Sequence, residues 1–306
     1  MSAQLPFRII HFAGMEWLVR QGKGNPDNNY WNDSNQSVWV DDQHRLHLKI
    51  RKINGIWTGA EIRSLQPTHY GLHRFYVDSR IDLLDKNVVA GLFLYKTYLK
   101  EADIEFSKWG QNNAPNAQYV IQPEIPQNTK KFNLHLQGNY TTHVIDWQKE
   151  QLYFKSFNDH NFEAPLPSYQ ITEWYYPNKT LIDDNRYFIH INLWLSKARA
   201  PEDLKEAELI IKSVDTPVSA VYFLTPNSYK DLTVYPNITR QRIQIVLRKA
   251  TKMSYELYDY KDFLIIKKSL DKPKANIDIS LLKIGKYRLV IKSGSNTYRF
   301  WFKKNY

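Results

Sequence analysis

Three acidic residues alternate along residues 100–110, KEADIEFSKWG. Glu101, Asp103 and Glu105 are each two positions apart, and the residues between them are apolar. Side chains two positions apart on a β-strand share one face, and each residue advances the chain by about 3.3 Å. The spacing therefore predicts a strand with three carboxylates in a row over roughly 13 Å of backbone, and an apolar face turned toward the core.

A row of carboxyl groups can hydrolyse a glycosidic bond. Retaining glycosidases place two carboxyl groups about 5–5.5 Å apart, one as the nucleophile and one as the acid/base. A third carboxylate between them raises the pKa of its neighbours by like-charge repulsion and can share a proton with one of them. The alternatives are a solvent-facing acidic strand and a metal site. No His or Asp pair stands nearby at ligand spacing, so we expect no metal at these acids and no cofactor. A structural calcium ion elsewhere stays an open alternative, for which no loop is legible.

The elements that must position these acids read as β-strands almost throughout. Short alternating runs are separated by Gly, Pro and Asn, without a βαβ rhythm. Residues 201–209, PEDLKEAEL, offer one short helix and are equally consistent with a loop. We expect an all-β protein built as an antiparallel sandwich or jelly roll. The runs expected as strands include residues 37–42, 45–52, 73–81, 101–106, 142–147, 151–157 and 187–195.

The charge is distributed unevenly over the 306 residues. Residues 1–215 carry 24 Lys/Arg and 25 Asp/Glu, a balance of −1, whereas residues 216–306 carry 18 and 6, a balance of +12. Eight of the nine Trp also precede residue 216. Such a shift is typical of a domain boundary. We predict two domains, residues 1–215 and 216–306, joined near 214–232, where Pro217, Pro226 and the run TPNSYKD interrupt the pattern.

The composition excludes several kinds of site. Without Cys, the chain has no disulfide framework and no thiolate ligand or nucleophile. No run of about 18 apolar residues is present that would cross a bilayer as a helix. The start, MSAQLPFRIIHF, lacks a charged segment followed by a long apolar one, so we expect either no export or a numbering that begins after a removed signal. The surplus of Tyr and Trp suits a β-rich core and a surface that stacks sugars equally well.

The motif EADIEF resembles the E-x-D-x-E signature of family-16 glycoside hydrolases, which have a concanavalin A-like jelly roll. Other segments resemble the same family in the same order, so that the resemblance covers about residues 8–214. It implies an all-β, concanavalin A-like jelly-roll sandwich that hydrolyses β-linked polysaccharides. The supporting segments are GAEIRS (59–64), HYGLHRFYVDSRI (69–81), VVAGLFLY (88–95), TTHVIDWQKEQLYF (141–154) and FIHINLWLS (188–196).

The resemblance also implies roles for individual residues. Glu101 would be the nucleophile, Glu105 the general acid/base, and Asp103 the group that adjusts its neighbours. Glu61 and Arg63 alternate on one strand and would hydrogen-bond sugar hydroxyls in the same cleft. The remaining residues expected to bind substrate are Trp194 as a stacking platform, Asn192 on its face, His143 and Trp109; the last two are equally consistent with structural or core positions.

Two segments depart from the family pattern. Lichenase-like members have a Trp two residues before the first Glu, where this chain has Leu99. Their N-Y-Y strand after the acidic one is replaced by AQYVIQP (117–123), without the Asn and the second Tyr. The departures argue against a lichenase substrate, while the three acids favour catalysis.

Residues 216–306 read as a small, basic β-sandwich. Their Lys residues are scattered over several runs rather than gathered on one, so we expect solvated strand faces and no nucleic-acid partner. The segments VYPN (234–237), YELYD (255–259) and IDISLLKIGKYRLVIKSG (277–294) resemble a C-terminal sorting domain of the type IX secretion system. Ile238 stands where that domain has Pro. The alternative is an immunoglobulin-like accessory module.

Together these features predict a retaining endo-glycosidase that acts on a β-linked polysaccharide or oligosaccharide. A non-catalytic carbohydrate-binding protein on the same fold is the alternative, and a structural or adhesive surface protein is a third. The resemblance of the basic domain implies contact with secretion machinery and an extracellular or cell-surface location. The sequence indicates neither the sugar and linkage nor the oligomeric state.

Overall fold

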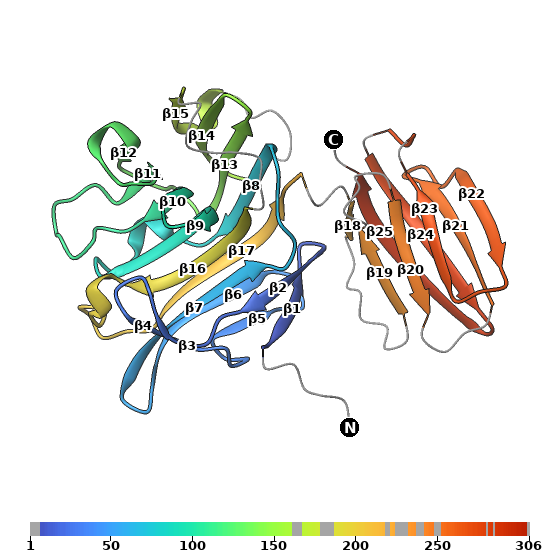
Figure 1. The fold of residues 1–306 in the computed structure, drawn as a ribbon, viewed down its shortest axis with the longest axis horizontal. Helices are drawn as coiled ribbons and strands as arrows, with labels where there is room; N and C mark the ends of the chain where they lie inside the picture. Colours follow the sequence, from blue (N-terminus) through green and yellow to red (C-terminus); the bar gives the residue numbers. More distant parts are fainter. Residues whose placement is uncertain are drawn as a thin grey trace. The chain divides into compact units, whose positions relative to one another are not determined.

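The fold is seen in a computed structural model that describes residues 7–160, 167–177, 187–217, 221–223, 232–236, 242–247, 252–279, 281–283 and 285–304 (Figure 1). The predicted joining run TPNSYKD, residues 225–231, lies outside these residues. The described part is built from β-strands and holds no α-helix. Its short 3₁₀ turns are η1 (Ile81–Leu83), η2 (Pro126–Asn128), η3 (Pro167–Tyr169) and η4 (Ser196–Ala198).

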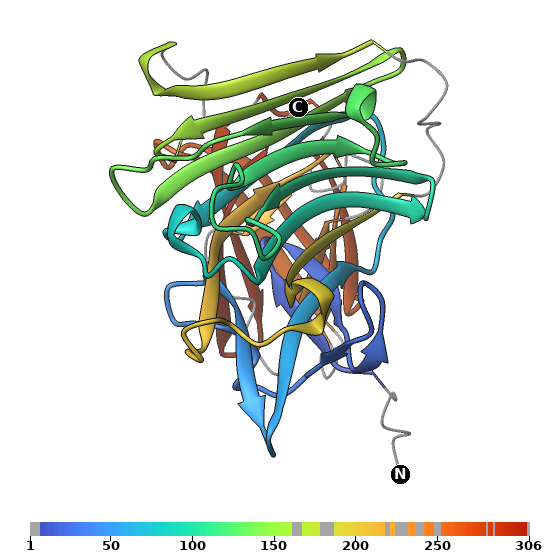
Figure 2. The ribbon, with the colours of Figure 1, turned by 90° about the vertical axis from the view of Figure 1, so that its left-hand side faces the viewer.

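One layer of the large sandwich contains the acidic strand β10, which has a neighbouring strand on each side. Its antiparallel order is β12–β11–β10–β9–β16–β7–β2, with β1 beside β2. Figure 2 shows that β9 and β10, drawn in teal, are curved. The bounds are β1 (Ile9–Phe12), β2 (Met15–Val19), β7 (Ile56–Ser64), β9 (Val88–Thr97), β10 (Lys100–Phe106), β11 (Ala117–Ile121), β12 (Thr129–Phe132) and β16 (Phe188–Leu195).

The second layer has the antiparallel order β15–β14–β13–β8–β17–β6–β5. The β6–β7 hairpin joins the two layers, and β4, which pairs with β3, runs parallel to β7. The bounds are β3 (Gly22–Gly24), β4 (Asn29–Trp31), β5 (Val38–Val40), β6 (Leu46–Ile53), β8 (Gly71–Asp78), β13 (Tyr140–Gln148), β14 (Gln151–Asn158), β15 (Gln170–Tyr176) and β17 (Ala207–Asp215).

The alternation on β10 sorts its side chains onto two faces, as predicted. Ala102, Ile104 and Phe106 are fully buried in the core between the layers, and the acids occupy the other face. Burying such side chains stabilises the sandwich by about 25 cal/mol for each Å² of apolar surface removed from water. Burial of the apolar face of β10 therefore fixes the position of the acidic side chains on its opposite face.

Each run predicted as a strand contains one, with differences in extent. The run at residues 37–42 forms only the short strand β5, Val38–Val40. The run at residues 73–81 ends as a strand at Asp78, and Ile81 begins the turn η1. Residues 201–206 are turn and loop leading into β17, so the loop alternative for residues 201–209 is correct. The described residues contain no helix long and apolar enough to span a membrane.

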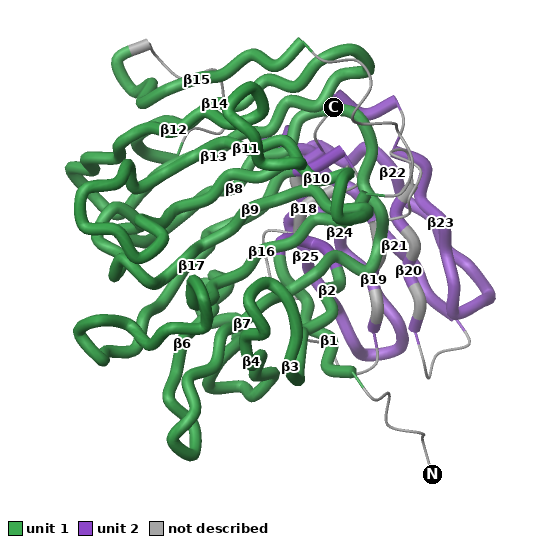
Figure 3. Tube along the Cα trace, turned by 60° about the vertical axis from the view of Figure 1, so that its left-hand side comes forward, with its two compact units in different colours: residues 1–12, 16–215 green, residues 13–15, 216–306 purple. Residues whose placement is uncertain are grey.

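The chain divides into two compact units, one of residues 1–12 and 16–215 and one of residues 13–15 and 216–306 (Figure 3). The second unit contains a sheet of order β18–β25–β24–β21–β22 and a sheet of order β19–β20–β23 around its own apolar core. The bounds are β18 (Val221–Phe223), β19 (Leu232–Pro236), β20 (Arg242–Leu247), β21 (Met253–Asp259), β22 (Leu264–Leu270), β23 (Lys274–Asp278), β24 (Gly285–Ser293) and β25 (Asn296–Lys304).

Candidate active site

A cleft of about 860 Å³ lies over the first layer of the large unit, within the range usual for ligand sites. Glu101, Asp103 and Glu105, called the acidic row below, all line it. Strands β7, β9 and β16 contribute the neighbouring part of its floor. The acids predicted from the sequence therefore share one concave surface.

Strand register arranges the floor in two lines across the sheet. Residues directly opposite each other on antiparallel strands project from the same face. The first line runs from Glu105 through Gly91 and Asn192 to Glu61. The second line runs from Asp103 through Phe93 and His190 to Arg63. Residues from four strands thus meet beside the acidic row.

The acidic row is held by hydrogen bonds from β11 and the residues after it. The Gln118 side-chain amide donates to Glu105 Oε2 at 2.8 Å, and the Gln122 amide approaches Asp103 Oδ2 at 3.4 Å. Asp103 is buried, and Glu101 and Glu105 are half-buried. The outer two carboxyls are thus open to the cleft.

Burial raises the pKa of every member of the acidic row, and the charges of neighbouring carboxylates, inside and outside the row, add to the rise. Burial raises the pKa of Glu101 to about 8, although a hydrogen bond with Asp103 opposes the rise. Burial also raises the pKa of Glu105 to about 7, against the hydrogen bond from Gln118. Burial and the charges of both glutamates hold the pKa of Asp103 well above its ordinary value. The acidic row therefore still holds protons near neutral pH. The loss of a proton from one of its carboxyls changes the pKa of the others.

Glu61 lies in the cleft lining, but other side chains occupy both of its oxygens. Arg20 Nη1 donates to Oε2 at 2.7 Å, and His190 Nδ1 lies 2.9 Å from Oε1. Burial alone would raise the pKa of this carboxyl, but the hydrogen bond and charge of His190 and the charge of Arg20 lower it. Glu61 thus stays ionised and orients His190, a different role from the direct sugar contact expected from the sequence.

Several buried polar atoms in and beside the cleft are left without a hydrogen bond from any described residue. Within the cleft lining they are His190 Nε2, Asn192 Oδ1 and Arg63 Nε. The guanidinium of Arg63 also lies 4.9 Å from the centre of the Phe188 ring. Buried polar groups are nearly always hydrogen-bonded in folded proteins, so unsatisfied atoms here indicate positions for ligand or water.

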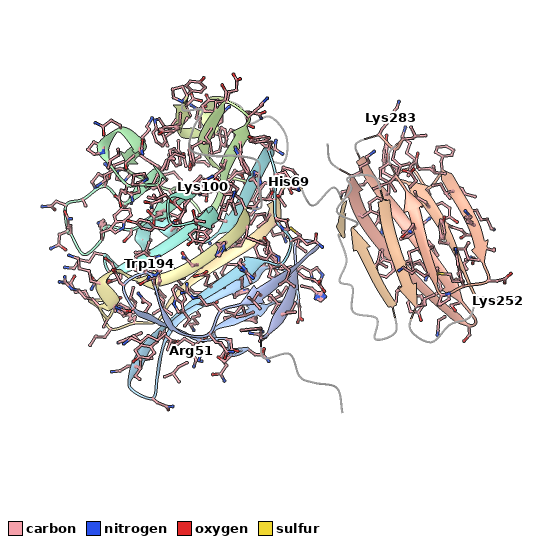
Figure 4. The ribbon with its side chains drawn as sticks, in the orientation of Figure 1. Arg51, His69, Lys100, Trp194, Lys252 and Lys283 are labelled. Carbon is pink, nitrogen blue, oxygen red and sulfur yellow. The ribbon has the colours of Figure 1, made fainter. Side chains whose placement is uncertain are left out.

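Aromatic side chains form part of the cleft walls. Trp194 is buried against Trp31 and presents only a small part of its surface to the cleft. Trp109 is half-buried and also lines the cleft, while the exposed Tyr98 stands at the turn before β10. Figure 4 marks Trp194 on β16 and Lys100, the first residue of β10, with their side chains. The predicted stacking residues Trp109 and Trp194 are thus both at the cleft.

His143 is not at the cleft, which corrects the expectation that it binds substrate. It is fully buried between the layers, where it contacts the Phe106 ring and hydrogen-bonds Ser156 and Thr141 at 2.8 and 2.9 Å. Burial lowers the pKa of its imidazole to about 3. His143 is therefore a neutral core residue, whose partners come from its own strand β13 and from β14.

The sequence alone did not identify His190, Gln118 and Gly91 as residues of the cleft. His190 stands two residues before Asn192, so strand alternation alone places both on one face. Gln118 and Gly91 enter the site through strand register, which the sequence does not specify. Within the residues that the structure describes, no group of three or more His, Asp or Glu is arranged to hold a metal ion.

Comparison with known proteins supports the fold predicted for the large unit and the resemblance predicted for the small unit. Residues 233–302 match the family model of the secretion system C-terminal sorting domain. No curated protein matches the sequence.

Solved structures with a similar fold include a β-1,3-glucanase from Mycobacterium marinum, at 18% identity over 66% of this chain and 90% of that chain, with a TM-score of 0.51. A family 16 glycosyl hydrolase from Mycobacterium smegmatis str. MC2 155 is similar over 66% and 91% at 16% identity, with a TM-score of 0.50. A laminarinase from Flavobacterium sp. UMI-01 is similar over 65% and 92% at 15% identity, also with a TM-score of 0.50. The large unit therefore has the jelly roll of these proteins.

Proposed function

We propose that this protein is a retaining endo-glycosidase that hydrolyses a β-linked glucan. The observation that carries the proposal is the acidic row, three carboxyls on one strand at the floor of a cleft, all with raised pKa values. Proteins with a similar fold include a β-1,3-glucanase and a laminarinase, which supports a β-glucan as the substrate class.

In the proposed reaction Glu101 attacks the anomeric carbon while Glu105 gives its proton to the glycosidic oxygen, which leaves with the bond electrons. The result is a glycosyl ester on Glu101 and an ionised Glu105. Glu105 then takes a proton from water as that water attacks the anomeric carbon and releases Glu101. The pKa of Glu105, raised to about 7 by burial, suits a group that must hold a proton and then accept one.

In this reaction Asp103 carries a proton so that the neighbouring Glu101 can be ionised. Three neighbouring buried carboxyls cannot all ionise, because each charge disfavours the next. When Asp103 keeps its proton and donates a hydrogen bond to Glu101, Glu101 is ionised and can attack. This hydrogen bond lowers the pKa of Glu101. Asp103 therefore acts as a positioning residue that sets the charge of the nucleophile.

The test is the release of reducing ends from laminarin, mixed-linkage β-glucan, agar, galactan and xylan. We expect cleavage of a β-glucan, and proton NMR of the first product should show the retained β-anomer. Glu101→Gln should abolish the release. Activity that survives this substitution would refute the role of Glu101, and an α-anomer as the first product would refute the retaining mechanism.

One observation favours the alternative, a carbohydrate-binding protein without catalysis. Burial raises the pKa of Glu101 to about 8, and a protonated carboxyl donates hydrogen bonds to sugars but cannot act as a nucleophile. This alternative predicts that the protein binds one polysaccharide of the panel and releases no reducing ends from any of them.

The small unit suggests export and delivery to the cell surface or medium. Residues 233–302 match a sorting domain, which supports contact between this unit and secretion machinery of the type IX kind. Expression in a bacterium that has this system tests the proposal. With the same N-terminal export signal placed before both, the full chain should reach the outside of the cell, and a chain that ends at Asp215 should be retained. Equal release of both would refute the proposal.

A further inference from the structure

A further acidic side chain, Glu124, lies beside the acid/base candidate Glu105 although it belongs to another part of the chain. Glu124 is exposed, lines the cleft, and stands in the segment between β11 and the turn η2. The amide nitrogen of Gln118 lies 2.8 Å from Glu105 Oε2 and 3.4 Å from Glu124 Oε1. One buried amide therefore faces two carboxyl groups and brings an exposed charge close to Glu105.

The two carboxyl groups determine which way the Gln118 amide points. Gln118 is 1% exposed, and its oxygen Oε1 is buried without a hydrogen bond from any described residue. An ionised carboxylate only accepts hydrogen bonds, so the donor end of the amide is turned toward both groups. Hydrogen bonds to charged acceptors are stronger than those between neutral groups, and they offset the cost of the unpaired oxygen. Glu124 therefore helps to hold an amide hydrogen on Glu105.

The segment that carries Glu124 is anchored before and after this residue. The side-chain oxygen of Gln122 accepts a hydrogen bond from the backbone N–H of Glu124 at 3.0 Å. The backbone N–H of Gln122 in turn donates to the carbonyl of Glu101 at 3.1 Å. After Glu124, the Asn128 side-chain amide donates to the carbonyl of Pro123 at 3.1 Å. The backbone therefore keeps the charge of Glu124 near the acidic row even though its side chain is exposed.

The charged groups around Glu105 come from several elements. The other two carboxyls of the acidic row share its strand, and Glu124 lies across the Gln118 amide. On β9 the opposite residue is Gly91, which carries no charge. On β12 the exposed Lys131 is opposite Gln118 and projects from the same face. A cation there weakens the field of Glu124, so we expect a moderate effect on Glu105 rather than a large one.

We infer that Glu124 is a positioning residue for the acid/base candidate: by sharing the Gln118 amide with Glu105, it places a negative charge beside that carboxyl and favours its protonated form. This role rests on the proposed function and adds to it a residue that sets the pH range of the acid/base step. Burial raises the pKa of Glu105 most, the hydrogen bond from Gln118 lowers it, and the charge of Glu124 raises it. After Glu105 has given its proton to the leaving oxygen, the same repulsion favours the return of a proton from water. The charge of Glu61, at the far end of the floor line, is paired with Arg20.

Titration of the Glu105 carboxyl by ¹³C NMR tests this role without a substrate. In protein labelled at the side-chain carboxyl carbon of Glu, the Glu105 signal is identified by its absence from Glu105→Gln. Glu124→Gln keeps an acceptor for the Gln118 amide but removes the charge. It should lower the Glu105 midpoint by about 0.5 pH units, the effect of one like charge about 6 Å away in a water-like medium. The matched control is Glu150→Gln, at the exposed turn between β13 and β14 and outside the cleft lining, which should leave the midpoint unchanged.

Salt provides a second measurement on the same signal. Salt screens the charge of an exposed side chain much more than that of a buried one. Raising sodium chloride to about 1 M should therefore lower the Glu105 midpoint more in the unaltered protein than in Glu124→Gln. An equal fall in both proteins would refute the role of the Glu124 charge.

The outcomes separate this role from the proposed function. An unchanged or raised Glu105 midpoint in Glu124→Gln refutes the role of Glu124 and leaves the glucan substrate untouched. If the unaltered protein releases reducing ends, the basic limb of kcat/KM should move to lower pH in Glu124→Gln by the same amount as the midpoint. A loss of rate that is equal at every pH would indicate a merely structural residue and refute the role. If no substrate is cleaved, the proposed function fails, and the NMR titration still decides whether Glu124 sets the protonation of Glu105.

Discussion

Replacing Glu101 with Gln should stabilise the large unit at pH 8 and leave its stability unchanged at pH 4. In the folded protein, burial raises the pKa of this carboxyl from 4.5 to about 8. At 1.36 kcal/mol for each pH unit, the difference corresponds to an upper limit of about 5 kcal/mol. The carboxyl is open to cleft water, and screening by that water reduces the expected gain to about 2 kcal/mol.

The sign of the effect follows from proton binding. Between pH 4.5 and 8 the folded state holds more protons at this site than the unfolded state, so stability falls as the pH rises through this window. Below pH 4.5 the side chain is protonated in both states, and Gln resembles that protonated form. The variant should therefore gain its advantage only as the pH rises.

Urea unfolding followed by Trp fluorescence at pH 4 and pH 8 measures this difference. Eight of the nine Trp precede residue 216, so the signal reports mainly on the large unit. Asp42→Asn, at an exposed turn, is the control and should show no such dependence on pH. The prediction is wrong if Glu101→Gln raises the free energy of unfolding equally at both pH values, or lowers it at pH 8. Either result would contradict a raised pKa of Glu101.

Three further predictions concern other parts of the molecule. Gln118→Leu removes the hydrogen bond that opposes the raised pKa of Glu105, so the basic limb of kcat/KM should move to higher pH; a downward shift would refute this reading. His143→Leu should cost about 1–3 kcal/mol in urea unfolding at pH 7 because it removes the hydrogen bonds of two buried hydroxyls, those of Ser156 and Thr141, with KM unchanged. Leu289→Ala, fully buried in the small unit, should destabilise that unit by about 2–5 kcal/mol in a protease-resistance assay; equal resistance would contradict its core position.

Strand alternation made much of the large unit predictable. The period of two residues in EADIEF places the acids on one face and Ala102, Ile104 and Phe106 on the other, and burial on folding enforces that choice. The same rule places Asn192 and Trp194 together on β16. Such patterns are local, so they can be read without knowing which strands are neighbours.

The rest of the site depends on contacts between distant segments. Gly91 faces Asn192 only because β9 and β16 pair in one register, and Glu61 meets His190 only because β7 is next to β16. The position of His143 also depends on contacts between distant segments. Its strand was predicted, but the sequence did not indicate which of the two faces of that strand is covered by the other layer.

The exposed turn before the acidic row has a consequence for how such a protein diversifies. Tyr98 and Leu99 are 74% and 52% exposed, whereas the apolar side chains of β10 that follow are fully buried. Mutations in the turn therefore meet little selection from folding, while those in the strand are constrained at almost every step. A lineage can therefore alter the rim of the proposed sugar site residue by residue and keep the acidic row, so that the ligand preference of the cleft changes faster than its carboxyl groups.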